Sequence, residues 1–287
     1  MRTQRILTIQ DFSCMGRCSL TVALPTISAC GIEAVSIPTA VLSNHTAFKS
    51  WTYLDMTKEM EPIVDHWMDY RHAFDYIYTG YLSNGQIGEV RKIIDRLKTE
   101  DTKTVIDPAM ADNGKLYPGF DEKHVEDMKL LFDGADVVLP NLSEACLLTG
   151  TKMPEQTPDL SFYQDLLDKV LALHTKAAVI TGVELHPGKV GLLLEEENSD
   201  TVFFYETEKY PGKYHGTGDL FASALVGVLD NGFALPQALK IAHDYVHVAI
   251  QKTVESKQDG MICGPCFEEA IPSLVDALRK AKEEREN

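Results

Sequence analysis

The segment His215-Gly216-Thr217-Gly218-Asp219-Leu220-Phe221 is the most informative part of this sequence. Two glycines deliver an aspartate to the start of an apolar helix, and glycines let backbone N–H groups approach an anion without a Cβ in the way. The first amides of a helix are unpaired and its N-terminal end is positively polarised, so such a turn predicts an anion site. A carboxylate beside a bound phosphate can accept the proton of an attacking hydroxyl, which indicates a small-molecule kinase.

Two other interpretations of this segment stay open. Asp219 can serve only as a cap that satisfies helix amides. The spacing of the glycines also resembles a dinucleotide-binding fingerprint, except that Phe221 stands where the last small residue is expected. That fingerprint normally follows a strand. The preceding residues 208–214 have the pattern of a loop, which disfavours dinucleotide binding.

The rest of the chain alternates short β-branched runs with segments of helical periodicity. Strands are expected at residues 5–10, 34–42, 76–79, 104–107, 137–139, 177–181, 190–194 and 202–205. Helices are expected at residues 19–31, 56–69, 84–98, 143–149, 160–173, 219–230, 235–254 and 267–284. This alternation predicts an α/β fold with a mostly parallel sheet and helices on both faces. Because no repeat or compositional break divides the sequence, one domain is expected over residues 1–287.

The composition narrows the class of partner. The 27 Lys and Arg residues against 43 Asp and Glu give a formal net charge of −16, which argues against nucleic acid or an anionic membrane as the main partner. We find no apolar run long enough to span a membrane and no signal-peptide pattern, so a cytoplasmic location is expected. In that compartment the six cysteines are expected to be reduced, and Cys263-Gly264-Pro265-Cys266 is expected to flank a helix start rather than to do redox chemistry.

Oxygen-bearing side chains follow several expected strands, where ligands of open α/β sheets bind. These residues are Asp11, Ser13, Ser43 to Thr46, Tyr81, Asp107, Asn141, Glu144 and Thr181. Such a donor set suits Mg²⁺ better than a soft metal. Asn141 and Glu144 also have the spacing of a capping box, and the two roles do not exclude each other. No Walker A motif is present, so a P-loop kinase is disfavoured.

Six motifs in order make the chain similar to the pyridoxal kinases of the ribokinase-like superfamily. They are the 216–221 string, Ser43-Asn44-His45-Thr46, Thr79-Gly80-Tyr81-Leu82, Asp107-Pro108, Pro140-Asn141 with Glu144, and Val179-Ile180-Thr181. The resemblance implies a three-layer αβα kinase that phosphorylates the 5′-hydroxymethyl group of pyridoxal, pyridoxamine or pyridoxine with ATP. It also implies Mg²⁺ and a homodimer, and it leaves open whether K⁺ assists.

The resemblance assigns roles to individual residues. Asp219 is expected to be the base, and Gly216, Thr217 and Gly218 are expected to bind the transferred phosphoryl group. Thr46, His45 and Tyr81 are expected to bind the vitamer, together with Asp11 or Ser13. Asp107, Asn141, Thr181 and Thr217 are expected on the ATP side, with Glu144 and Asp107 toward the metal. Residues 111–120, including Asp112 and Tyr117, are expected to form a lid.

The first loop departs from the family pattern. It reads Gln10-Asp11-Phe12-Ser13-Cys14, where the family often has Gln-Ser-His. The ring contact therefore stays open between Asp11 and Ser13, and an aspartate there also suits the related hydroxymethylpyrimidine kinases. Those enzymes usually carry Cys where Asp219 stands and lack the Ser-Asn-His-Thr segment. A B6-binding protein without catalysis is a further alternative, which the presence of Asp219 disfavours.

Overall fold

A computed structural model of the chain describes residues 3–69, 73–199 and 201–286. The α/β class is confirmed, with mostly parallel strands and helices packed beside them. The chain divides into two units, one made of Met1–Tyr76 with Tyr210–Asn287 and the other of Ile77–Lys209. Of the helices in the described ranges, none combines the length and apolar character that a membrane crossing requires.

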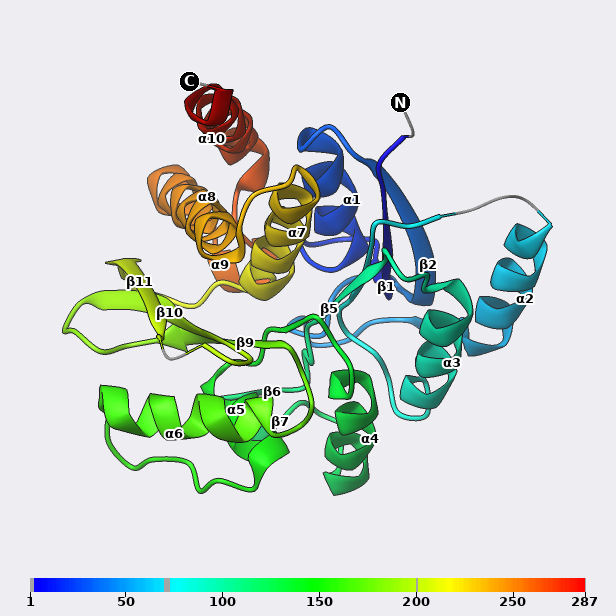
Figure 1. The fold of residues 1–287 in the computed structure, drawn as a ribbon, viewed down its shortest axis with the longest axis horizontal. Coiled ribbons are helices and arrows are strands. Elements are labelled where there is room, and N and C mark those ends of the chain that lie inside the picture. Colours follow the sequence, from blue (N-terminus) through cyan, green and yellow to red (C-terminus); the bar gives the residue numbers. More distant parts are fainter. Residues whose placement is uncertain (1–2, 70–72, 200, 287) are drawn as a thin grey trace. The chain divides into compact units, whose positions relative to one another are not determined.

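The first unit is built on β1 (Arg5–Ser13), β2 (Glu33–Leu42) and the short edge strand β3 (Tyr53–Asp55). β1 and β2 are parallel, and α1 (Leu20–Ala29) connects them (Figure 1). Their register shifts at Asp11, where one residue of β1 stands opposite two residues of β2. Such bulges turn the end of a strand away from regular pairing and are frequent beside active sites. The first loop therefore starts from an irregular strand end.

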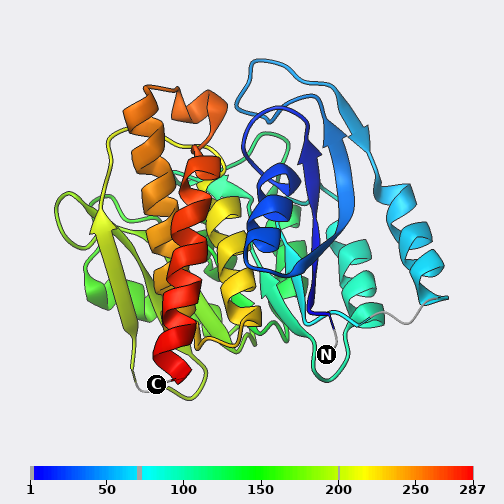
Figure 2. The same cartoon turned by 90° about the horizontal axis from the view of Figure 1, so that it is seen from above.

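Helices complete the first unit. They are α2 (Thr57–Met68), α7 (Thr217–Asp230), α8 (Leu235–Ser256), the short α9 (Gly260–Cys263) and α10 (Phe267–Glu286). Every residue of α7 from Leu220 to Leu229 is buried, because α1, α8 and α10 pack around it (Figure 2). A helix that is apolar on all sides can only be stable when it is enclosed in this way. The N-terminus of α7 is thereby fixed in position.

The second unit carries strands in the order β11-β10-β9-β8-β5-β4. Their bounds are β4 (Tyr76–Thr79), β5 (Lys103–Ile106), β8 (Val137–Val138), β9 (Ala177–Val183), β10 (Lys189–Glu196) and β11 (Phe203–Glu208). β5, β8 and β9 are parallel, while β9, β10 and β11 are antiparallel. The helices are α3 (Ile87–Leu97), α4 (Glu122–Phe132), α5 (Leu142–Thr149) and α6 (Leu160–Leu171).

Several elements were not among those expected from the sequence. They are β3, α4, α9 and a separate two-stranded hairpin of β6 (Ala111–Asp112) and β7 (Lys115–Leu116). The three strands have two or three residues each, too few for a periodic pattern to be visible. The hairpin falls inside residues 111–120, the segment expected to be a lid.

Candidate active site

The turn before α7 has the conformation that its glycines permit. Gly216 is the residue preceding the helix and has a φ of 83°. A Cβ at Gly216 would lie 2.1 Å from the carbonyl oxygen of Arg17, so only glycine fits. Thr217, Gly218 and Asp219 are the first three residues of α7, and their N–H groups have no carbonyl four residues earlier in the helix. The turn thus presents donors suited to an anion.

Asp219 does not cap its own helix. No side chain caps α7, and Oδ2 of Asp219 instead accepts a hydrogen bond of 2.8 Å from the backbone N–H of Ser19. Burial raises the pKa of Asp219 to about 7, and the charge of Asp11 adds to the rise, against the lowering effect of the Ser19 hydrogen bond. The side chain is half-buried. A carboxyl with a pKa near neutral is suited to accept a proton, and its second oxygen is the one left for that task.

The first loop contacts Asp219 through the Ser19 N–H, within the same unit. Asp11 and Ser13 are buried, and Ser13 Oγ donates a 2.9 Å hydrogen bond to Asp11 Oδ2. Burial raises the pKa of Asp11, against the lowering effect of the neighbouring serine hydroxyls. Burial and the charges of Asp219 and Asp11 raise the pKa of the Cys18 thiol. The structure therefore connects Asp219 to the first loop through the N–H of Ser19, a residue that the sequence marked only as a helix start.

His45 connects several loops of the first unit. The amide of Ala47 donates to His45 Nδ1 at 3.2 Å, so Nε2 carries the proton and donates to the Ile262 carbonyl oxygen at 2.8 Å. The ring also stacks on His215, with 4.1 Å between the ring centroids. Burial lowers the pKa of His45, and it lowers that of His215 to about 4 with help from His45. Both rings are therefore neutral at pH 7. Thr46 beside them is exposed.

In the second unit, the carboxyl ends of the strands bring together three residues expected on the ATP side. Asn141 and Thr181 pair in an isolated parallel bridge. The Asp107 amide donates to the Thr79 carbonyl at the end of β4, and the Leu139 amide donates to Ile106 at the end of β5. The Asp107 carboxylate accepts from the Ala109 amide at 3.1 Å. The strand-end placement predicted from the sequence is thus present.

Glu144 forms the capping box with Asn141 and also holds the lid segment. One of its oxygens accepts from the amides of Met110 and Ala111, and the other accepts from the amide of Asn141. Burial raises the pKa of Glu144 to about 7. Asn141 Nδ2 donates to the Ala111 carbonyl, and Ser143 Oγ accepts from the Gly114 amide. The start of α5 is therefore joined to the first strand of the β6–β7 hairpin and to the turn between its two strands.

The other predicted lid and vitamer residues are more exposed. Tyr117 is 38% exposed, and its amide donates to the Met110 carbonyl. Asp112 accepts from the amide and side chain of Asn113. Tyr81 is half-buried and stacks on Phe120, with 5.5 Å between the centroids.

The donor set in the second unit is compatible with Mg²⁺ held through water. Asp107 and Glu144 provide carboxylates, but both Glu144 oxygens already accept backbone N–H groups. Among the residues in the described ranges, no three His, Cys, Asp or Glu side chains form a group that could hold a metal. Mg²⁺ commonly keeps several waters and uses one or two carboxylates together with substrate phosphates, so this arrangement fits it.

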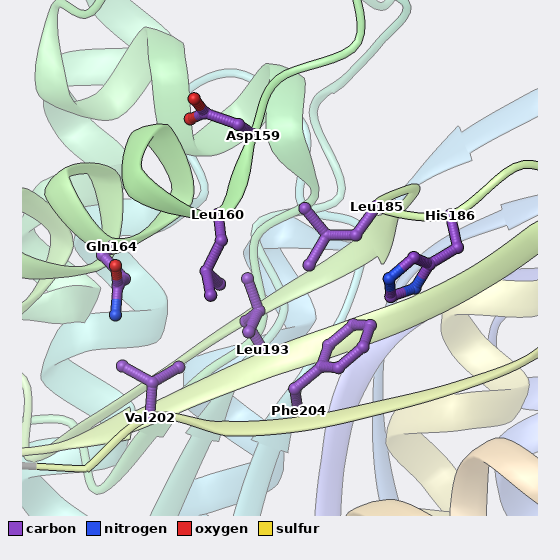
Figure 3. A pocket seen from close by; sticks show the side chains of 8 residues that line it. All are labelled: Asp159, Leu160, Gln164, Leu185, His186, Leu193, Val202 and Phe204. Atoms are coloured by element: carbon purple, nitrogen blue, oxygen red, sulfur yellow. The ribbon is translucent and has the colours of Figure 1, made fainter.

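A cavity of about 420 Å³ lies elsewhere in the second unit. Figure 3 shows its lining, in which His186 lies beside Phe204 and Leu185 faces Leu193. Glu206 approaches His186 Nδ1 at 3.0 Å. None of the predicted site residues lines this cavity. The residues predicted at the start of α7 and at the strand ends therefore lie outside this cavity.

Known proteins resemble this chain over most of its length. The family model described as phosphomethylpyrimidine kinase matches residues 20–265. A crystal structure described under that name from Bacteroides thetaiotaomicron, in a form with pyridoxal, is 34% identical, with a TM-score of 0.89 over 95% of this chain and 96% of that one. The pyridoxal kinase structure from Lactobacillus plantarum is 28% identical, with a TM-score of 0.87 over 95% and 97% of the chains. The curated pyridoxal kinase of Dictyostelium discoideum is 27% identical over 78% of this chain and 77% of its own length.

Proposed function

This chain belongs to the phosphomethylpyrimidine kinase family, and we propose that it transfers the γ-phosphoryl group of ATP to the 5′-hydroxymethyl oxygen of a B6 vitamer. The vitamers are pyridoxal, pyridoxamine and pyridoxine. The family shares its name with kinases of a pyrimidine alcohol, but curated relatives that match most of the chain are pyridoxal kinases. Hydroxymethylpyrimidine kinase activity and B6 binding without catalysis are both less favoured.

One observation carries the proposal: a half-buried carboxyl with a pKa of about 7 stands in the first turn of a helix whose leading amides have no partner in the helix. Asp219 can accept the hydroxyl proton at the oxygen that Ser19 does not hold. The hydroxymethyl oxygen then bonds to the γ-phosphorus, and the bond from that phosphorus to the β–γ bridging oxygen breaks. ADP leaves, and the vitamer 5′-phosphate is formed. The amides of Gly216, Thr217 and Gly218 stabilise charge on the transferred group.

The remaining roles stay predictions. We assign the vitamer to Thr46, His45 and Tyr81, together with Asp11 or Ser13. We assign ATP to Asp107, Asn141, Thr181 and Thr217. When bound, Mg²⁺ supplies positive charge at the phosphate oxygens, and Asp107 and Glu144 would hold it through water. Assistance by K⁺, the lid role of Asp112 and Tyr117, the single domain over residues 1–287, the homodimer and the cytoplasmic location also remain to be tested.

An ATP-consumption screen tests the function. Purified protein with Mg²⁺ is given each of the three vitamers and hydroxymethylpyrimidine in separate reactions, and product is identified by mass. We expect ADP and vitamer phosphate to form in equal amounts. A much faster reaction with hydroxymethylpyrimidine would show that the pyrimidine alcohol, and not a B6 vitamer, is the substrate. Tight vitamer binding without ADP formation would show that the protein binds the vitamer without catalysis. Sedimentation of the same sample tests the dimer.

A further inference from the structure

The residues just before α1 contact the turn before α7 through their backbone. The carbonyl oxygen of Arg17 lies so close to Gly216 that a Cβ on this glycine would come within 2.1 Å of it. Nearby in the chain, the Ser19 N–H donates a 2.8 Å hydrogen bond to Asp219 Oδ2. One short segment, residues 17–19, therefore contacts both the turn assigned to the phosphoryl group and the carboxylate assigned as the base.

The side chain of Arg17 binds the connection between α8 and α10 and the first turn of α10. Its Nε donates to Glu268 Oε1 at 2.9 Å, and its Nη1 donates to Gln258 Oε1 at 3.0 Å. The carbonyl oxygens of Cys263 and Gly264 lie 3.5 Å from the same Nη1. An arginine that binds a phosphate directs its planar fork at that ligand. This guanidinium is engaged by acceptors of the protein instead, so it anchors its own backbone.

Two glycines pack against the Arg17 backbone. Besides Gly216, Gly264 approaches it closely, since a Cβ on Gly264 would lie 2.7 Å from the Arg17 carbonyl oxygen and 2.8 Å from the Arg17 Cβ. Backbones come this near only where a residue has no Cβ. The His215 amide also donates to the Gly260 carbonyl at 3.0 Å. The connection between α8 and α10 therefore contacts the turn before α7 directly and holds Arg17 beside it.

We propose that Arg17 is a positioning residue for phosphoryl transfer: its side chain fastens residues 17–19 to the start of α10. Fastened in this way, the segment supports Gly216 with a carbonyl group and holds Asp219 with the Ser19 N–H. This inference rests on the proposed function, because it concerns the turn and the base assigned there. A displacement of about 1 Å in a catalytic group can lower turnover about 100-fold, so loosening the anchor should slow the reaction.

The first experiment measures steady-state kinetics of Arg17 variants in the full chain. Arg17→Ala removes the anchor and should lower kcat about 10- to 100-fold, with less than about a threefold change in KM for the vitamer, because the displaced groups act on the transition state. Arg17→Lys can keep the ion pair with Glu268 but not the hydrogen bond to Gln258 as well, so its kcat should be intermediate. Each kcat is referred to the folded fraction of the sample, measured by circular dichroism.

Arg285→Ala is the matched control, because Arg285 also binds carbonyl groups, but beyond the opposite end of α7. Its Nη1 donates to the carbonyl oxygens of Asn231 and Gly232 at 3.4 and 2.9 Å, just after the last residue of that helix. Loss of these bonds should lower stability and leave kcat per folded molecule as in wild type. An equal fall in kcat in Arg285→Ala and Arg17→Ala would show a general effect of stability and would overturn the inference.

Glu268→Gln weakens the same anchor from its other side. It should lower kcat less than Arg17→Ala does, because Gln258 still binds the guanidinium. Since both substitutions act on one interaction, the double variant should be no slower than Arg17→Ala, and additive losses would contradict the proposal. Guanidinium ion, added well below unfolding concentrations, should not rescue Arg17→Ala, because it cannot refasten the segment. Restored turnover would show that the positive charge acts on the phosphates directly and would overturn the inference.

Amide hydrogen exchange measures the anchor without any reaction. Arg17→Ala should speed exchange in peptides that cover residues 17–19 and 215–219, because local opening there becomes easier, whereas Arg285→Ala should not. If wild type phosphorylates no B6 vitamer, the proposed function fails and this inference fails with it. If wild type is active, unchanged exchange or unchanged kcat in Arg17→Ala overturns the inference alone. Should Arg17→Ala not fold, Arg17→Lys and Glu268→Gln decide the outcome by the same criteria.

Discussion

Replacing Asp219 by Asn should remove most of the turnover and make the protein more stable, with the larger gain in stability at the higher pH. Asn keeps the size of the side chain and an oxygen that can accept the Ser19 N–H, so the fold should be retained. It cannot accept the hydroxyl proton, and loss of a general base typically lowers turnover by about 10²- to 10⁴-fold. The stability gain follows because the folded protein partly buries the charged carboxylate of Asp219, which is unfavourable, and Asn carries no charge.

The magnitude follows from the pKa of Asp219. The difference between the folded value of about 7 and the ordinary 3.8 corresponds to about 4 kcal/mol at about 1.36 kcal/mol per pKa unit. Because the side chain is half-buried, solvent screening should reduce this to about 2 kcal/mol. The folded state keeps the proton to a higher pH than the unfolded chain does. The wild-type protein therefore loses this stability as pH rises from about 4 to about 7, whereas the amide side chain of the variant does not ionise at all.

Urea unfolding of wild type and Asp219→Asn at about pH 5 and about pH 8 measures this difference. We expect the variant to be more stable at both values and its advantage to be larger at the higher one. Turnover of the same samples is measured in parallel. An inactive variant that is no more stable than wild type at pH 8 would show that the ionised carboxylate is not penalised, and an active variant would refute the role of Asp219 as the base.

Three further predictions concern the same sites. Turnover of wild type should rise with pH through about 7 as Asp219 ionises, and the profile of kcat against pH should lack this limb in any residual activity of Asp219→Asn. Gly216→Ala should cost about 3 kcal/mol in urea unfolding, because its Cβ would meet a backbone oxygen, whereas Gly31→Ala, with a φ of 82° and open space around it, should cost only about 1–2 kcal/mol; equal losses would contradict the contact. Glu144→Gln should cost about 1–3 kcal/mol, because its amide N–H group would face a backbone N–H. It should also speed proteolysis of residues 111–120, because the Glu144 carboxylate anchors the start of this segment through the amides of Met110 and Ala111; unchanged proteolysis would show that Glu144 does not hold the lid.

Local patterns in the sequence were enough to predict most of the fold. The helix after Asp219 was visible because its glycines and its continuous apolar run lie next to each other in the chain. The hairpin of β10 and β11 was also predictable, because its two strands follow one another in the chain. α4 was missed, although Val125, Met128 and Phe132 are buried at helical spacing, because charged residues interrupt a short apolar pattern. That signal was available in the sequence.

The site was predictable in its residue types but not in its contacts. The chemistry of Asp219 follows from its neighbours in sequence, but its hydrogen bond comes from Ser19, 200 positions away. Nothing in the first loop indicates that Asp11 and Ser13 are buried, because both are polar and follow a strand. The stacking of His215 on His45 likewise depends on loops that only tertiary structure brings together. Long-range packing, which no local pattern encodes, decides these features.

A crystal structure of the protein with pyridoxal and a non-hydrolysable ATP analogue tests the central claim most directly. We predict that the 5′-hydroxyl oxygen lies about 2.6–3.2 Å from the Asp219 oxygen that Ser19 leaves free, within reach for proton transfer. An alcohol bound well beyond hydrogen-bonding distance of Asp219, with another side chain beside its oxygen, would contradict the claim.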